Sequence, residues 1–313
     1  MSEPFRFAHL SDPHLSSLHT VAMKQLCSKR ILGYLSWKIH RQAEHRREVL
    51  TALERDLQAC TPDHITITGD LTHLGLPSEF QEVQEWLHGL GPASKVTVIP
   101  GNHDAYVDTP WEDTFALWAP YMCSDHTESV ESQPHYPEHE FPSIRIRGSI
   151  AFIGLSSAQP TAPFMATGCL GKQQLNRLSS LLATTREHNL FRIVLVHHPP
   201  ALGTVKWRKR LVDSQPLLSV LGQYGAELIL HGHAHRSSFV NLESPTGSIP
   251  AIGVPSASYI GKRMDRTAQY HLYELTQSEG GWNLHCSIRG YVPEKDIFEE
   301  QNETTITLPY LVP

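Results

Sequence analysis

Five short clusters of histidine, aspartate and asparagine follow five apolar segments of the chain, and this arrangement limits the fold more than any other feature. Each segment is rich in aliphatic or aromatic residues and predicts a strand. Because the carboxyl ends of strands in an open α/β sheet meet at one crevice, we expect the clusters to lie together. The clusters are Asp12-Pro13-His14, Gly69-Asp70, Gly101-Asn102-His103-Asp104, His197-His198-Pro199 and Gly232-His233-Ala234-His235.

Strands and helices alternate along most of the chain. The spacing of apolar residues predicts helices over 44–60, 172–184 and 216–223. Ser78 and Gln81 predict a capping box that opens one more helix. Two stretches, residues 16–47 and 108–149, interrupt the alternation, and we expect them to be cap-like insertions beside the clusters. The predicted strands are 5–10, 64–68, 95–99, 150–155, 191–196, 227–230, 238–242, 249–254, 270–275 and 282–288.

Charge and cysteine content exclude several classes of protein. The 313 residues include 26 Lys and Arg against 32 Asp and Glu, and this net charge of −6 disfavours binding to a nucleic-acid duplex. No apolar run approaches the ~18 residues of a membrane span, and no apolar secretory signal opens the chain. Five scattered cysteines without a CxxC pair indicate neither a disulfide framework nor a thiolate zinc site. We therefore expect a cytoplasmic protein.

The side chains of the five clusters suit a divalent metal. Carboxylate, carboxamide and imidazole groups are ligands of Mn²⁺, iron and Zn²⁺. An Asp-x-His or His-x-His pair places two of these groups on one side of an extended segment. The chain also holds 20 histidines, more than its 10 phenylalanines and 5 methionines together. The residues by themselves therefore predict metal chemistry.

In this order, the five motifs resemble the calcineurin-like metallophosphoesterase superfamily, whose patterns are D-x-H, G-D, G-N-H-D/E, H-x-P and G-H-x-H. The resemblance extends from Asp12 to His235. It implies a single α/β domain over residues 1–313, built as a four-layer α/β/β/α sandwich with two mixed β-sheets and outer helices. It also implies two divalent metal ions, either Mn²⁺, Fe²⁺/Fe³⁺ or Zn²⁺.

The resemblance implies a role for each matching position. His103 would be the catalytic histidine, and Asp104 fills the acidic position after it, where it could orient the imidazole. Members with a longer G-D-x-x-D motif pair a second acid with that histidine. Here His73 takes that position, so the group that supports His103 stays open. The implied ligands are Asp12, His14 and His235 for the first metal, Asn102, His197 and His233 for the second, and Asp70 as the bridge.

The implied reaction is hydrolysis of a phosphorus–oxygen bond by metal-bridging hydroxide attack. Two metals about 3.5–4 Å apart lower the pKa of the bridging water toward ~7 and hold the phosphoryl oxygens. His103 would protonate or stabilise the departing oxygen. The expected substrate is a small phosphodiester, of the cyclic-nucleotide or glycerophosphodiester type.

Two basic and aromatic segments bear on the substrate. The first follows the fourth cluster and is a candidate for binding a second phosphate or a nucleotide. The second, residues 28–40, is either a surface helix that packs Ile31, Leu32 and Leu35 on the sheet or an amphipathic cap that contacts lipid, an acyl chain or a nucleobase. The candidate substrate residues of the first segment are Lys206, Trp207, Arg208 and Arg210.

Two alternative functions stay open. Some members of the superfamily hydrolyse the pyrophosphate of UDP-2,3-diacylglucosamine in lipid A synthesis. The two basic segments favour such a nucleotide-linked substrate, with peripheral contact to the inner membrane through residues 28–40. The other alternative is a metal-binding interaction scaffold without turnover, against which the presence of His103 argues.

Overall fold

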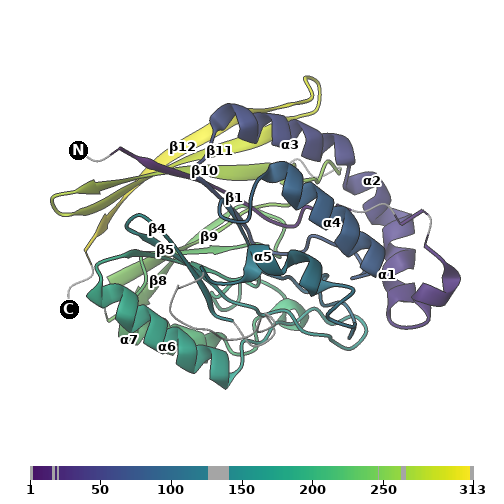
Figure 1. Cartoon of the computed structure of the whole chain (residues 1–313), viewed down its shortest axis with the longest axis horizontal. Helices are drawn as coiled ribbons and strands as arrows, with labels where there is room; N and C mark the ends of the chain where they lie inside the picture. Colours follow the sequence, from purple (N-terminus) through teal and green to yellow (C-terminus); the bar gives the residue numbers. More distant parts are fainter. Residues whose placement is uncertain are drawn as a thin grey trace.

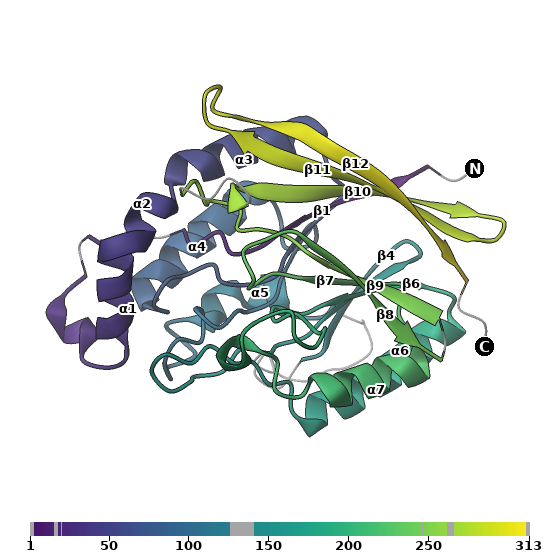
Figure 2. The same ribbon diagram turned by 180° about the vertical axis from the view of Figure 1, so that it is seen from behind.

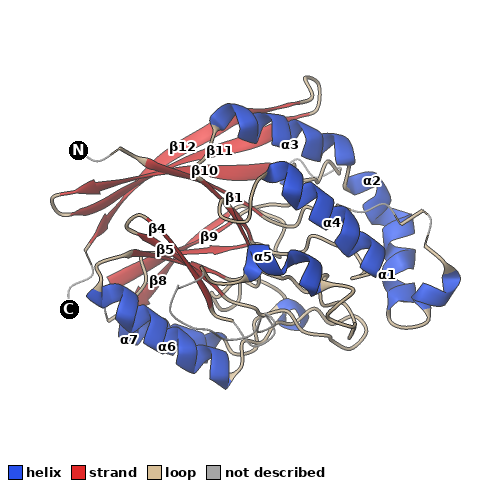
Figure 3. Cartoon of the chain, in the orientation of Figure 1, coloured by secondary structure: helices blue, strands red, loops and turns tan. Residues whose placement is uncertain are grey.

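Two β-sheets packed face to face, with helices on the outer face of each, make up the fold (Figure 1, Figure 3). The structure is a computed structural model. It describes residues 3–15, 18–19, 21–125, 141–245, 247–261 and 266–310. Part of the predicted cap, residues 126–140, lies outside the described residues.

The first sheet contains the first three clusters. Its strand order within the described residues is β12–β11–β10–β1–β2–β3. Strands β1, β2 and β3 run parallel, whereas β10, β11 and β12 pair antiparallel with their neighbours. Their bounds are β1 Phe5–Leu10, β2 His64–Ile67, β3 Val96–Val98, β10 Gln269–Ser278, β11 Gly281–Val292 and β12 Ile297–Pro309.

The second sheet contains the last two clusters. Its strand order in the described part of the chain is β4–β5–β6–β7–β9–β8. The four central strands are parallel, and β4 and β8 pair antiparallel at the two edges. The bounds are β4 Ser143–Arg147, β5 Ile150–Gly154, β6 Phe191–Leu195, β7 Leu228–His231, β8 Ser238–Ser244 and β9 Gly247–Gly253.

Aromatic and aliphatic side chains fill the space between the sheets. Phe7 of β1 stacks on Tyr273 of β10 with ring centroids 4.8 Å apart, and its edge meets Phe152 of β5 at 5.6 Å. All three side chains are fully buried. Because successive residues of β1 point to opposite faces, its neighbours Ala8 and Leu10 instead join the apolar cluster under the helices.

Amphipathic helices cover the outer faces (Figure 1, Figure 2). Helices α3 and α4 bury apolar stripes against the first sheet, and α6 and α7 do so against the second. The predicted four-layer α/β/β/α sandwich with two mixed sheets is confirmed. The helix bounds are α1 Arg30–Ser36, α2 Gln42–Glu44, α3 Arg47–Cys60, α4 Pro77–Leu90, α5 Ala119–Met122, α6 Lys172–Glu187 and α7 Ser214–Tyr224.

The start of α4 differs from the prediction. Ser78 is exposed in the first turn, and the N-cap is Leu76, followed by Pro77. The carboxylate of Glu79 accepts backbone N–H groups from His73, Leu74 and Leu76 at 2.7–3.0 Å. The predicted capping box is therefore wrong, because an acidic side chain three residues into the helix satisfies the free donors instead.

The insertion over residues 16–47 is helical in its second half. Helix α1 continues into a π-helical turn, Trp37–Arg41, and then into α2. Trp37 packs with Leu74 and Leu76, but Ile31, Leu32 and Leu35 are 44%, 37% and 48% exposed. The prediction that these three aliphatic residues pack on the sheet is wrong. In the described part of the chain, no helix is long and apolar enough to cross a bilayer.

Candidate metal centre

The five predicted clusters converge at one edge of the sandwich. Strands β1, β2 and β3 are neighbours in one sheet, β6 and β7 are neighbours in the other, and all five end at this edge. Five of the cluster residues have left-handed backbone angles, with φ between 42° and 64°, although none is glycine. These turns direct the side chains into the space between the strand ends. The five residues are Asp12, His14, Asp70, His233 and His235.

Two overlapping groups of ligand atoms lie in this space. Within each group, the candidate atoms are all within 4.8 Å of one another, and Asp70 belongs to both groups. Asn102 adjoins the second group, with its Oδ1 3.3 Å from Nε2 of His197. The first group is Asp12, His14, Asp70 and His235, and the second is Asp70, His197 and His233.

The orientation of the imidazoles suits bound cations. Nδ1–H of His14 donates to the Thr72 carbonyl at 2.8 Å, and Nδ1–H of His197 donates to the Thr68 carbonyl at 2.6 Å. Each ring therefore turns its Nε2 toward the centre, which is how metal-binding histidines are commonly oriented. Nε2 of His14 and Nε2 of His233 are buried and have no hydrogen-bond partner among the described residues. Because such atoms are costly to bury, a pair of divalent cations fits the site.

Electrostatics divides the site into neutral imidazoles and one charged pair. Burial, with neighbouring imidazoles, lowers the pKa of His14, and burial followed by the guanidinium of Arg41 lowers that of His103. Burial also acts to lower the pKa of His197. There, however, the Asp70 carboxylate 3.4 Å away prevails and raises the pKa to about 9. A metal ion at the second group must therefore displace a proton from His197.

His103 is oriented by a backbone group. Its Nδ1–H donates to the carbonyl of His73 at 2.6 Å, and its backbone N–H donates to Asp70 Oδ1 at 2.7 Å. The side chain of His73 instead stacks on His14 with ring centroids 5.0 Å apart. The residue at the usual acidic position thus supports His103 through its main chain. The sequence left open which group supports His103, and this group is the His73 carbonyl.

Asp104 has a different role from the one expected. Its carboxylate accepts backbone N–H groups from Asp70, Leu71, Thr72 and Gly101 at 2.8–2.9 Å. It joins the loop after β2 to the loop after β3, and the imidazole of His103 is not among the partners that the described contacts give it. We expected Asp104 to orient that imidazole. Its contacts instead hold the backbone of Asp70 in place.

A cleft of about 350 Å³ leads to His103 from the surface. Helix α1 and the π-helical turn form one wall, and residues 164–166 with Arg208 and Lys209 form the other. Of the four candidate substrate residues, Arg208 lines the cleft, whereas Lys206, Trp207 and Arg210 do not. Lys209, which the candidates omitted, lines it as well.

Two further residues of the insertion reach the site and were missed. Nη1 of Arg41 lies 2.9 Å from Nε2 of His103. His45, which is not in the predicted ligand set, forms a third candidate group with His14 and His235. Its Nδ1 lies 2.8 Å from the Ser258 hydroxyl. Neither residue follows a predicted strand, so no local sequence signal distinguishes them from other surface cations and histidines.

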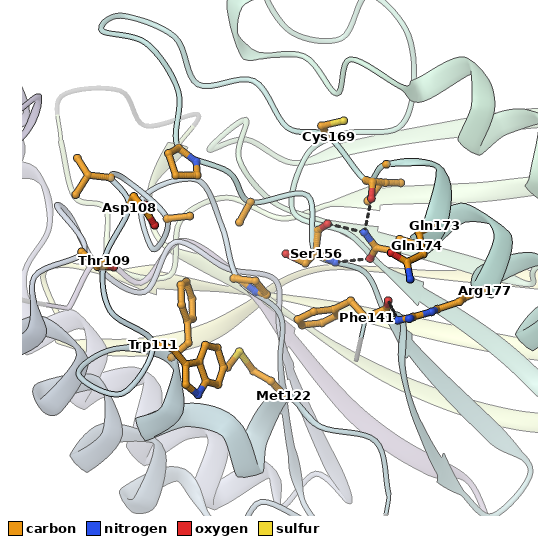
Figure 4. A pocket seen from close by; sticks show the side chains of 18 of the residues that line it. Asp108, Thr109, Trp111, Met122, Phe141, Ser156, Cys169, Gln173, Gln174 and Arg177 are labelled. Carbon is orange, nitrogen blue, oxygen red and sulfur yellow. Dashed lines mark hydrogen bonds between the residues drawn. The ribbon is translucent and has the colours of Figure 1, made fainter. Parts of the chain in front are cut away.

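A larger cavity, of about 480 Å³, lies elsewhere (Figure 4). Trp111 and Met122 lie at one end of it, and Phe141 lies beside Arg177 towards the other, where Ser156 and Gln174 also line it. None of the predicted metal ligands, nor His103, lines this cavity. Its size therefore does not make it the reactive site, because Asn102 and His103, which lie beside the groups of ligand atoms, line the smaller cleft instead.

The chain is similar to proteins that act on phosphoesters. A family model described as calcineurin-like phosphoesterase matches residues 5–237. A probable cyclic nucleotide phosphodiesterase of Synechococcus sp. is 27% identical over 72% of this chain and 77% of its own length. A 3',5'-cyclic-nucleotide phosphodiesterase of Nostoc sp. is 25% identical over 76% of this chain and 79% of its own.

A solved structure has the same arrangement of layers. It is a dimetal phosphatase from Danio rerio, with a TM-score of 0.55 and 13% sequence identity. The similarity covers 98% of this chain and 99% of that one. At this level of identity, the likeness shows the fold alone.

Proposed function

Because the chain belongs to the calcineurin-like phosphoesterase family, hydrolases that cleave phosphoesters with divalent metals, we propose that it hydrolyses a small phosphodiester of the cyclic-nucleotide or glycerophosphodiester type. One observation carries the proposal. Two groups of ligand atoms share Asp70, and the imidazole of His103 lies beside them at the end of a cleft. Two divalent ions at these groups would supply Lewis-acid activation of the phosphoryl oxygens and a bound water of lowered pKa.

The ligand set that we propose follows the two groups. Asp12, His14 and His235 hold one ion, and Asp70 is shared. The second ion is held by Asn102, His197 and His233. Mn²⁺, iron and Zn²⁺ all accept this mixture of carboxylate, carboxamide and imidazole ligands.

His103 and Arg41 act on the substrate itself. The His73 carbonyl holds Nδ1–H of His103, which leaves Nε2 directed at the cleft. In the free enzyme the ring is neutral and its one proton is on Nδ1, so we expect Nε2 to take up a proton when the anionic substrate binds and to donate it to the leaving oxygen. The guanidinium of Arg41 lies beside Nε2 of His103. When substrate binds, we expect it to donate a charge-assisted hydrogen bond to a non-bridging phosphoryl oxygen.

The cleft suits a substrate with one anionic part and one flat or apolar part. Arg208 and Lys209 supply positive charge, and Trp37, Tyr106 and Phe164 supply aromatic surface. A volume of about 350 Å³ is at the lower end of the range for small-molecule sites. The names of both bacterial relatives add support for a cyclic nucleotide.

Phosphorus NMR of the Mn²⁺-loaded protein tests the proposal. Cyclic AMP, a glycerophosphodiester and UDP-2,3-diacylglucosamine are incubated separately, with a chelator-treated sample as the control. Formation of AMP or of a glycerol phosphate supports a phosphodiesterase. UMP with a lipid monophosphate would instead favour the pyrophosphate hydrolase. The basic residues of the cleft and the exposed aliphatic residues of α1 support this alternative.

The metal-binding scaffold makes a different prediction in the same experiment. A protein that binds two equivalents of metal but leaves every substrate intact, including bis(p-nitrophenyl) phosphate, would contradict the proposed hydrolysis. Metal content is measured on the same sample, so that an unloaded enzyme is not mistaken for an inactive one.

A further inference from the structure

Helix α1 exposes a ridge of aliphatic side chains at the end of the molecule opposite the two termini (Figure 1). Ile31, Leu35 and Ile39, which we call the α1 ridge, are 44%, 48% and 70% exposed. They are spaced four residues apart, so they lie along one side of the helix that α1 forms with the π-helical turn. None of the three belongs to an apolar cluster in the described part of the chain.

The opposite side of this helix already packs on the protein. A Cβ on Gly33 would clash with the ends of the Leu74 and Tyr106 side chains, so glycine lets the helix pack closely here without displacing them. Trp37 is 4% exposed and packs with Leu18, Leu26 and Leu74. The helix therefore has two apolar sides. The side with Trp37 packs on the protein, and the side with the α1 ridge is exposed. An unpacked apolar ridge of this kind indicates an interaction surface.

The segment of the chain that carries the ridge contains basic but no acidic side chains. No Asp or Glu occurs between residues 13 and 43, whereas Lys24, Lys29, Arg30, Lys38 and Arg41 fall in this stretch. Removing five cations from the totals leaves 21 basic against 32 acidic residues, so the remainder of the chain carries −11. Lys24 and Lys38 are exposed and form no ion pair among the described residues. The other three cations point inward.

The contacts of these inward cations join α1 to the catalytic cleft. Nζ of Lys29 donates to the Thr161 carbonyl at 3.0 Å, which ties α1 to the loop that carries Phe164. Phe164 is 78% exposed, and it lines the cleft together with Leu32, the neighbour of Ile31. The exposed apolar surface thus continues from the ridge to the mouth of the cleft.

We propose that the α1 ridge, with Lys24 and Lys38, docks the enzyme onto the surface of an anionic phospholipid bilayer. Exposed aliphatic side chains beside lysines, in a segment without acidic residues, match the two layers of such a surface, the acyl boundary and the anionic headgroups. A second copy of the chain is a poorer occupant, because two ridges of the same charge would repel each other. The contact is peripheral, and the cleft opens at the membrane.

Vesicle sedimentation tests the proposal without reference to hydrolysis. The full chain is mixed with vesicles of phosphatidylcholine alone or with about one third phosphatidylglycerol, at low and high ionic strength. We expect binding to the anionic vesicles only, weakened by salt. I31E/L35E should lower the bound-to-free ratio at least about tenfold, because both apolar insertion and charge attraction are lost.

A matched variant separates the ridge from general effects of charge. F239E/I297E adds the same two acids at apolar positions that are 51% and 38% exposed on strands β8 and β12. It should bind vesicles like the wild type. Thermal melting and hydrolysis of bis(p-nitrophenyl) phosphate without vesicles check that both variants are folded.

Three outcomes would overturn the proposal. The first is a wild-type protein that stays in the supernatant with both kinds of vesicle. The second is an equal loss of binding in I31E/L35E and F239E/I297E. The third is a concentration-dependent dimer that I31E/L35E abolishes while no vesicle is bound, which would assign the ridge to self-association.

Discussion

The candidate metal centre and the insertion beside it, residues 16–47, are built in opposite ways. The candidate metal centre lies at the ends of five strands. There the carboxylate of Asp104 accepts hydrogen bonds from the backbone N–H groups of Asp70, Thr72 and Gly101. The insertion exposes aliphatic side chains and reaches the site through Arg41 and His45. The sheets therefore supply the residues proposed for the chemistry, and the insertion supplies groups that can change the substrate without disturbing the core.

The difference also appears in the backbone. Asp12, Asp70 and His233 hold left-handed angles that disfavour an L-residue by roughly 1–2 kcal/mol each. Such strain persists only where the surroundings over-determine the conformation, as the hydrogen bonds of Asp104 and of Asp12 Oδ2 do here. In α1 and the π-helical turn, the backbone is helical, and Ile31, Leu35 and Ile39 are exposed. We expect substitutions in the two regions to have different consequences.

The largest effect should come from Asp70→Asn, because Asp70 belongs to both ligand groups. Loss of the shared carboxylate should lower phosphodiester hydrolysis by ~10⁴-fold, the size of several kcal/mol of lost transition-state stabilisation. Metal analysis of the purified protein should show less than two equivalents. A variant that keeps both metals and full activity would contradict the shared role of Asp70.

His103→Ala should lower kcat by ~10²–10³-fold and leave the metal content unchanged. The reason is that His103 contacts the cleft but is not in either ligand group. His88→Ala, at an exposed position of α4, is the matched control and should behave like the wild type. If His103→Ala also loses metal, the residue belongs to the metal centre and not to the leaving-group side.

Arg41→Ala tests whether the insertion takes part in the reaction. We expect kcat to fall by ~10–100-fold with the metals retained, since one charge-assisted hydrogen bond to the phosphoryl group is lost. Arg41→Lys should recover part of the rate, because it restores the charge without the forked geometry. Lys38→Ala, an exposed cation three residues away, is the control. Equal rates for Arg41→Ala and Lys38→Ala would show that Arg41 does not contact the substrate.

The affinity for Mn²⁺ should rise with pH by about tenfold per unit below the His197 pKa of about 9. Below that pKa the imidazole is protonated in the metal-free protein, and the proton competes with the metal. Above it the dependence should level off. Calorimetric titrations in two buffers with different ionisation enthalpies measure the proton released. Metal binding without proton release below pH 9 would contradict this assignment.

His45→Ala should have the smallest effect. His45 lies beside His14 and His235, but the first ligand group is complete without it. We expect metal affinity at that group to fall by about tenfold or less, as for residues that support a ligand set. A competition titration with a chelator of known affinity measures the change. An effect as large as that of Asp70→Asn would make His45 a required ligand.

Much of the fold could be predicted because its signals are local. Apolar periodicity gives the helices over α3, α6 and α7 to within a few residues at each end, and the buried strands read as continuous apolar runs. Strand β12 was missed, because Glu299, Gln301 and Glu303 give it no apolar run. Strand β4 was hidden in the predicted cap, because its pairing with β5 is set by tertiary contacts.

The sequence by itself determined which groups could hold a metal and that the strands before them end on the same side of the fold. Their residue types, their order and the apolar segments before them are all local properties of the chain. Only the tertiary structure decided that the His73 carbonyl orients His103, that Asp104 positions Asp70, and that Arg41 reaches His103. These contacts join residues 30 to 62 positions apart in the sequence. The turns at the strand ends have left-handed angles at residues that are not glycine, so the residue types do not predict them. Because such contacts depend on how the loops pack on one another, local patterns do not carry them.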